Sequence, residues 1–98
     1  MSTLYLVLKG EWFDKIERGE KTHEYRVAKP YWATRIHNLL NSNDDDLFII
    51  FIRGYHKGAP ILEAEITNIG MIMDGRETDL NVDTAVYDIE FRNVRRIT

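Results

Sequence analysis

The change from a helical to a strand-like pattern around Gly19 constrains the fold of this chain more than any other feature. Residues 11–18 carry their apolar side chains at helical spacing, and glycine commonly follows the last turn of a helix. Polar and apolar residues then alternate over residues 22–27, as in a half-buried strand. The chain therefore passes from helix to strand within a few residues, which favours an α+β fold.

In the strand expected at residues 22–27, side chains alternate between the two faces. Thr22, Glu24 and Arg26 would then share one face, so that an acid and a base are neighbours. Lys21 would lie at the corner between the helix and the strand, from which its long side chain reaches the same cleft. This arrangement predicts a cleft that contains one carboxylate and several cations.

The remaining segments predict a small, mostly antiparallel β-barrel of five to six strands with two flanking helices. Pro30 is suited to the first position of a helix, and the apolar residues that follow it, including Leu40, recur at helical spacing. Strands are expected at residues 4–8, 22–27, 46–53, 61–69 and 85–94, and helices at residues 11–18 and 30–40. We expect one domain over residues 1–98, because this length supports a single core.

The composition is that of an ordinary globular chain, with 44% hydrophobic and 30% charged residues. No apolar run approaches the roughly 20 residues of a membrane span, and no leader segment is evident, so we expect a cytoplasmic protein. The absence of cysteine excludes disulfides and thiolate metal sites. The three histidines lack ligand spacing, and we expect neither a metal nor a cofactor.

Basic residues are concentrated in the first part of the chain and at its end, although the net charge is −3. Residues 1–41 hold seven Lys or Arg against five Asp or Glu, whereas residues 42–90 hold three against eleven. Residues 91–98 add three arginines and no acid. This distribution is typical either of a patch that binds a polyanion or of an ordinary solvated surface.

The octapeptide Gly-Glu-Lys-Thr-His-Glu-Tyr-Arg at residues 19–26 reads G-x-K-x-x-E-x-R and resembles the signature of the ASCH family, small PUA-like β-barrel domains. The likeness extends over Thr3 to Arg26, over residues 29–35 and over residues 54–60, which are similar to short bacterial and phage members. The resemblance implies a cleft that receives RNA or a modified nucleoside. The implied partner is therefore RNA, a nucleotide or a nucleoside.

The candidate ligand-binding residues are the charged residues of the motif and the basic and aromatic residues near it. They are Lys9, Lys21, Glu24, Arg26, Tyr31, Arg53, Tyr55 and Lys57. The tyrosines are candidates for stacking on bases, whereas Trp32 sits at core spacing. The neighbouring cations are expected to lower the pKa of Glu24. In the alternative interpretation, Glu24 and Arg26 only pair with each other to close the wall of the cleft.

Three functions remain open at this level. The first is RNA or nucleotide binding, the second is hydrolysis in the same cleft, and the third is protein interaction without catalysis. Some ASCH proteins are N4-acetylcytidine amidohydrolases and others ribonucleases, and the resemblance places Lys21 at the catalytic lysine of the former but Glu24 at their nucleophilic threonine. Thr22 is then a candidate nucleophile, with Lys21 as its base and Glu77 or Asp79 as the orienting acid, and Glu24 is a candidate catalytic base on water or a less usual nucleophile.

Overall fold

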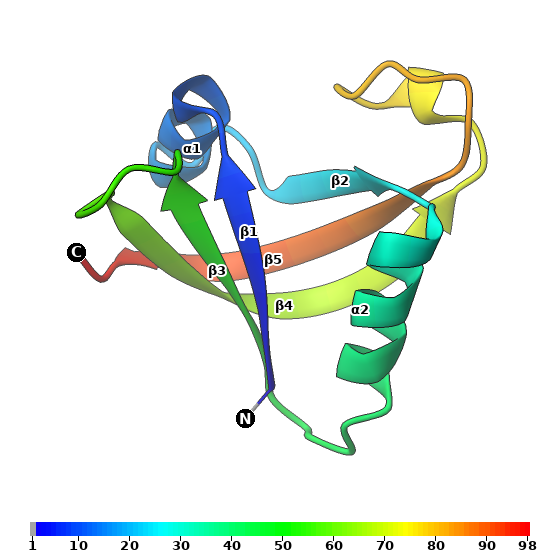
Figure 1. The fold of residues 1–98 in the computed structure, drawn as a ribbon, viewed down its shortest axis with the longest axis horizontal. Helices are drawn as coiled ribbons and strands as arrows, with labels where there is room; N and C mark the ends of the chain where they lie inside the picture. The colour runs from blue at the N-terminus through cyan, green and yellow to red at the C-terminus, as the bar shows by residue number, and fades with distance from the viewer. Residues whose placement is uncertain (1) are drawn as a thin grey trace.

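A computed structural model describes residues 2–98 as one curled, mixed sheet with two helices (Figure 1). The strand order is β1 (Ser2–Leu8), β3 (Leu47–Arg53), β4 (Ile61–Ile72), β5 (Val86–Arg96) and β2 (His23–Val27). The helices are α1 (Gly10–Glu17) and α2 (Pro30–Leu40), and a short 3-10 turn, η1, spans Gly75–Glu77. The predicted α+β fold of mostly antiparallel strands with two helices is confirmed.

The path of the chain leaves the two edge strands facing one another. β1 pairs in parallel with β3, and the other three pairings are antiparallel. The parallel pair is joined by a long crossover that contains α1, β2 and α2. The sheet curls into a half-barrel, so that β1 and β2, its two edges, lie on either side of its open side (Figure 1).

The curl is concentrated in β4 and β5, the two longest strands. Their register shifts twice, between Glu63 and Glu65 and between Ile66 and Asn68. Asn93 on β5 has a positive φ of 54°, which a short polar side chain tolerates better than most. Such irregularities increase the twist of a sheet and bend the strands that contain them. They allow five strands to wrap around one core.

The core fills the concave side of the sheet. Leu4, Leu6 and Leu8 alternate along β1 and are buried, while Tyr5 between them is exposed. The other buried members of the core are Phe13, Ile16, Ile36, Leu39, Ile49, Phe51, Leu62, Ala64, Ile89 and Phe91. Trp32 is only partly buried and packs against this cluster.

The exposure of Leu40 and the lengths of β4 and β5 differ from the sequence-based expectation. Leu40 was expected on the apolar face of α2 but is 55% exposed, at the last position of the helix. β4 and β5 extend beyond residues 69 and 94, since each strand continues to form hydrogen bonds with the other.

None of the helices within residues 2–98 is long and apolar enough to cross a membrane.

Candidate functional site

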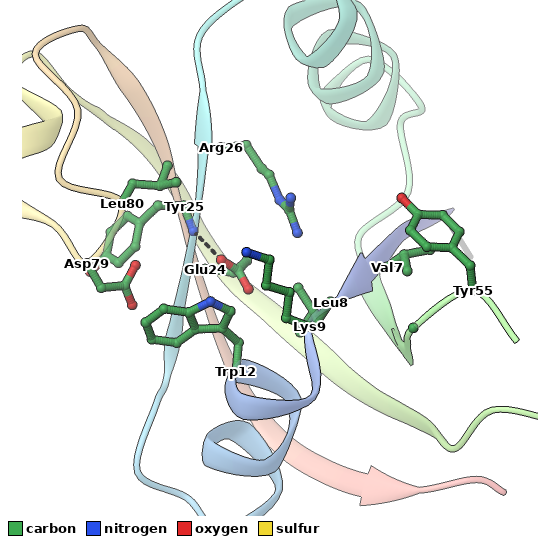
Figure 2. A pocket seen from close by; sticks show the side chains of 11 residues that line it. Val7, Leu8, Lys9, Trp12, Glu24, Tyr25, Arg26, Tyr55, Asp79 and Leu80 are labelled. Carbon is green, nitrogen blue, oxygen red and sulfur yellow. Dashed lines mark hydrogen bonds between the residues drawn. The ribbon is translucent and has the colours of Figure 1, made fainter.

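A pocket of about 420 Å³ lies between the end of β1 and the middle of β2, the two edge strands (Figure 2). Four parts of the chain besides β2 contribute to it: the end of β1, the start of α1, the loop after β3 and the loop that contains η1. The lining residues are Val7, Leu8, Lys9, Trp12, Glu24, Tyr25, Arg26, Gly54, Tyr55, Asp79 and Leu80. The pocket therefore occupies the place where the half-barrel is not closed by strand pairing.

The first part of the motif turns the chain from α1 into β2. Gly19 has a φ of +78°, a left-handed conformation that glycine adopts without the strain a side chain would add. Its N–H donates to the carbonyl of Ile16 at 3.1 Å, and the N–H of Glu20 donates to that of Lys15 at 2.9 Å. This pair of bonds is the Schellman arrangement that ends a helix. The turn places Lys21 at a buried position, where the residue is 8% exposed, instead of in solvent.

Lys21 is a buried cation held by two carboxylates and two aromatic rings. Its side chain is only 7% exposed, and its Nζ donates to a carboxylate oxygen of Asp79. The Nζ also lies 3.9 Å from Oε1 of Glu24. The rings of Trp12 and Tyr25 have their centroids 5.3 Å and 5.0 Å from it. Lys21 therefore fastens the η1 loop to the motif and contacts Glu24, but it does not itself line the pocket and instead borders a separate hollow.

Glu24 is buried beside Lys21, with a side chain that is 8% exposed. Its Oε1 accepts a hydrogen bond of 2.9 Å from the backbone N–H of Tyr25, which Figure 2 shows as a dashed line. Its Oε2 is buried and has no hydrogen-bond partner among residues 2–98. A buried carboxylate oxygen without a donor is costly. Glu24 thus presents an unused acceptor in a pocket.

The expected lowering of the Glu24 pKa is wrong, because burial outweighs the cations. Desolvation raises the pKa of this carboxyl above its ordinary value, and Lys21, Arg26 and the Tyr25 N–H offset only part of the effect. The charged form of a carboxyl loses its hydration when it is buried, whereas the neutral form loses little. Glu24 is therefore closer to the protonation range of a general acid or base than an exposed glutamate.

Arg26 and Lys9 provide positive charge that no carboxylate within the described chain neutralises by an ion pair. Figure 2 shows both side chains pointing into the pocket, Arg26 from β2 and Lys9 from the end of β1. The guanidinium of Arg26 stacks on Trp32 at 5.2 Å, and its Nε is buried without a hydrogen-bond partner among the described residues. Arg26 does not pair with Glu24, so the alternative of a closed cleft wall is wrong.

Aromatic side chains line opposite sides of the pocket. Trp12 and Tyr25 lie near Glu24 and Asp79, while Tyr55 lies on the far side, next to Val7 (Figure 2). Tyr55 is 93% exposed, so its ring is free to contact a ligand. The pocket thus combines aromatic surfaces with a few charged groups, as small-molecule sites commonly do.

Four of the candidate ligand-binding residues do not line this pocket: Lys21, which contacts Glu24 from outside it, and Arg53, Lys57 and Tyr31. Arg53 lies over Gly10 and donates from Nε and Nη2 to the two carboxylate oxygens of Asp14, each at 3.1 Å. Lys57 is exposed in the loop after β3. Tyr31, on the first turn of α2, is exposed and stacks with Arg35. The structure thus gathers Lys9, Glu24, Arg26 and Tyr55 in the pocket, places Lys21 against Glu24 outside it, and leaves Arg53, Lys57 and Tyr31 elsewhere.

Thr22 was expected on the face of Glu24 and lies outside the pocket. β2 begins only at His23, so the alternation of a strand does not extend to Thr22. Its carbonyl accepts a bond of 3.1 Å from the N–H of Phe91, and it borders a separate hollow near Arg92. Of the two acids named to orient a nucleophile, Asp79 pairs with Lys21 and Glu77 does not line the pocket.

Sequence reasoning missed several residues of the site. Trp12 was not singled out from the sequence as a site residue; it is only partly buried and lines the pocket. Leu80 comes from the long acidic loop before β5, where no pattern distinguishes it. The only available signal was the motif lysine, which needs a carboxylate partner when it is buried. That requirement points to an acid but does not distinguish Asp79 from Glu77, the other acid proposed from the sequence.

The basic tail of the chain does not add to the pocket. Arg95 and Arg96 form ion pairs of 2.6 Å with Glu63 and of 2.7 Å with Glu17, and Arg92 lies 3.9 Å from Glu65.

Within the described residues, no group of three or more His, Asp or Glu side chains is arranged to hold a metal ion. In comparisons with known proteins, the chain matches neither a family model nor a curated sequence.

Proposed function

We propose that the pocket binds a nucleotide, either free or as part of a single-stranded RNA. The observation that carries this proposal is the buried Oε2 of Glu24, which lacks a donor and lies beside Arg26 and Lys9, two cations without a carboxylate partner in the described chain. A ligand that suits this site has N–H donors, hydrogen-bond acceptors and negative charge. A nucleotide provides all three, in its base edge and its phosphate.

The walls of the pocket support the same ligand class. Trp12, Tyr25 and Tyr55 offer rings for a base to stack on, and the volume of about 420 Å³ lies within the usual range for small-molecule sites. In this arrangement Glu24 and Arg26 contact the base edge, and Lys9, near the rim, contacts the phosphate. We also propose that the chain is an ASCH domain, an assignment supported by its motif and by its curled sheet with two helices.

A fluorescence titration tests this proposal, because Trp12 lines the pocket and reports on a stacked base. The ligands are the four ribonucleoside monophosphates and an unstructured RNA of eight nucleotides. Arg26→Ala should weaken binding about tenfold or more, since a charge-assisted hydrogen bond is lost. Arg92→Ala, which removes the same charge from an exposed site on β5, is the matched control. Absence of binding, or equal binding by both variants, would refute the proposal.

A second candidate is a hydrolase that uses the same pocket, and the burial of Glu24 favours it. A carboxylate whose pKa is raised is a better general base near neutral pH than an ordinary glutamate. It would accept a proton from water as the hydroxide attacks the substrate, while the guanidinium of Arg26, which lines the pocket, stabilises the developing negative charge. Incubation of the protein with RNA and with N4-acetylcytidine, followed by product analysis, tests this candidate. Product formation that persists in Glu24→Gln would refute it.

A further inference from the structure

The arginines of this protein fall into two groups. Six of the eight are within ion-pair distance of a carboxylate: Arg18, Arg53, Arg76, Arg92, Arg95 and Arg96. Arg26 and Arg35 are the two that have no such pair within residues 2–98. The chain carries more acids than bases, so carboxylates are plentiful. Two arginines left without one are therefore a feature that calls for a physical explanation.

These two arginines are the ends of one continuous series of contacts, which we call the arginine–aromatic ladder: Arg26, Trp32, Tyr31 and Arg35. The guanidinium of Arg26 lies 5.2 Å from the ring of Trp32, and that of Arg35 lies 4.4 Å from the ring of Tyr31. The two rings meet edge to face at 5.0 Å. Stacking fixes the plane of a guanidinium and leaves its N–H groups free to bind an anion in the plane.

The ladder connects the pocket with a second groove. Arg26 lines the pocket, whereas Arg35 lines a hollow of about 300 Å³ between β1 and α2. This hollow is bordered by Ser2, Thr3, Leu4, Tyr5, Arg35, Asn38 and Leu39, so its one charged side chain is a cation. Tyr5 is 64% exposed and projects from the same face of β1 as Val7, which borders the pocket.

We propose that the arginine–aromatic ladder holds the backbone of a single-stranded RNA, one nucleotide of which occupies the pocket. A phosphate that flanks this nucleotide binds Arg35, and the next base stacks on Tyr5 in the groove between β1 and α2. This inference rests on the proposed function, since the strand enters the groove from the pocket. Free cations and exposed aromatic rings along one track are the features with which proteins bind single strands.

The test compares a ribonucleoside monophosphate with an unstructured RNA of eight nucleotides on the wild type, Arg35→Ala and Tyr5→Ala. The wild type should bind the octamer more tightly than the monophosphate. Arg35→Ala should leave monophosphate binding unchanged and weaken octamer binding about threefold to tenfold. The slope of log affinity against log salt for the octamer should fall by about 0.7, the value for one phosphate contact on a single strand. Tyr5→Ala should also weaken only the octamer.

Arg92→Ala is the matched control, because it removes an exposed arginine far from the ladder in sequence and leaves the groove intact. The inference is overturned if Arg35→Ala behaves like Arg92→Ala towards the octamer, or if the octamer binds no more tightly than the monophosphate. It is also overturned if Arg35→Ala changes the oligomeric state in sedimentation and not the RNA affinity, which would indicate an interface between copies. Failure of the monophosphate to bind would instead refute the proposed function of the pocket.

Discussion

Replacement of Lys21 by methionine tests whether this buried cation allows the carboxylate of Glu24 to be buried at the pocket. The substitution keeps a long, flexible side chain of similar volume and removes the charge. Glu24, with a side chain only 8% exposed, then lies buried without its nearest cation, and Asp79 loses its partner. Removing one member of a fully buried ion pair costs about 3–5 kcal/mol, mainly because the other charge stays buried.

The cost here should lie below that range, because both contacts of Lys21 are weaker than those of a fully buried pair. Asp79 is 34% exposed and regains hydration, and the distance from Lys21 to Glu24 is 3.9 Å. We therefore expect Lys21→Met to lower the free energy of unfolding at pH 7 by about 2–3 kcal/mol. For a domain of this size, such a loss lowers the midpoint of thermal unfolding by about 10–20 °C.

The sign of the pH dependence follows from the Glu24 pKa. Desolvation raises this pKa, and Lys21 is the strongest influence that lowers it, so Lys21→Met raises it further. A carboxyl whose pKa is higher in the folded state stabilises the fold fully below its unfolded pKa, and this contribution is lost as the pH rises through the folded pKa. The loss of stability caused by Lys21→Met should therefore be larger at pH 7 than near pH 4.

Urea denaturation of the wild type and variants at the two pH values measures this effect. Addition of Glu24→Gln to Lys21→Met should restore much of the stability at pH 7, because the double variant no longer has a buried carboxylate without its cation. Lys15→Met, the same change at an exposed position of α1, is the control and should stay within about 0.5 kcal/mol of the wild type. An equal loss at both pH values, or no recovery in the double variant, would refute the reasoning.

Three other predictions follow from the same geometry. Gly19→Ala should cost about 1–2 kcal/mol in urea denaturation, because φ is +78° and the added Cβ meets no atom within 4 Å, so that only backbone strain acts. Tyr55→Ala should weaken nucleotide binding by about 1–3 kcal/mol in the fluorescence titration, and an unchanged affinity would place the base on the opposite wall. N4-acetylcytidine should be turned over slowly or not at all, since the resemblance to ASCH amidohydrolases would place Glu24 at the position of their nucleophilic threonine. Rapid product formation that disappears in Lys21→Ala would contradict this.

The sequence by itself determined the local features of this protein. The alternation in Leu4 to Leu8, the helical spacing before Gly19 and the proline that opens α2 all predict elements that the structure contains. These signals are local, because the period of a strand or helix and the conformation of a glycine depend on neighbouring residues. The same local rule correctly placed Glu24 and Arg26 side by side, as residues on one face of a strand.

Only the tertiary structure decided the chemistry of the site. The partner of Lys21 is 58 residues away, and the pKa of Glu24 rises because other elements cover it, which no local spacing reveals. Thr22 lies outside the site because β2 begins to pair with β5 at His23, one residue later than the alternating sequence pattern predicted. That Arg26 and Arg35 have no carboxylate partner within the described residues could be recognised only from the ion pairs that the other six arginines form. Burial and charge pairing depend on contacts between distant segments, and the fold alone selects these.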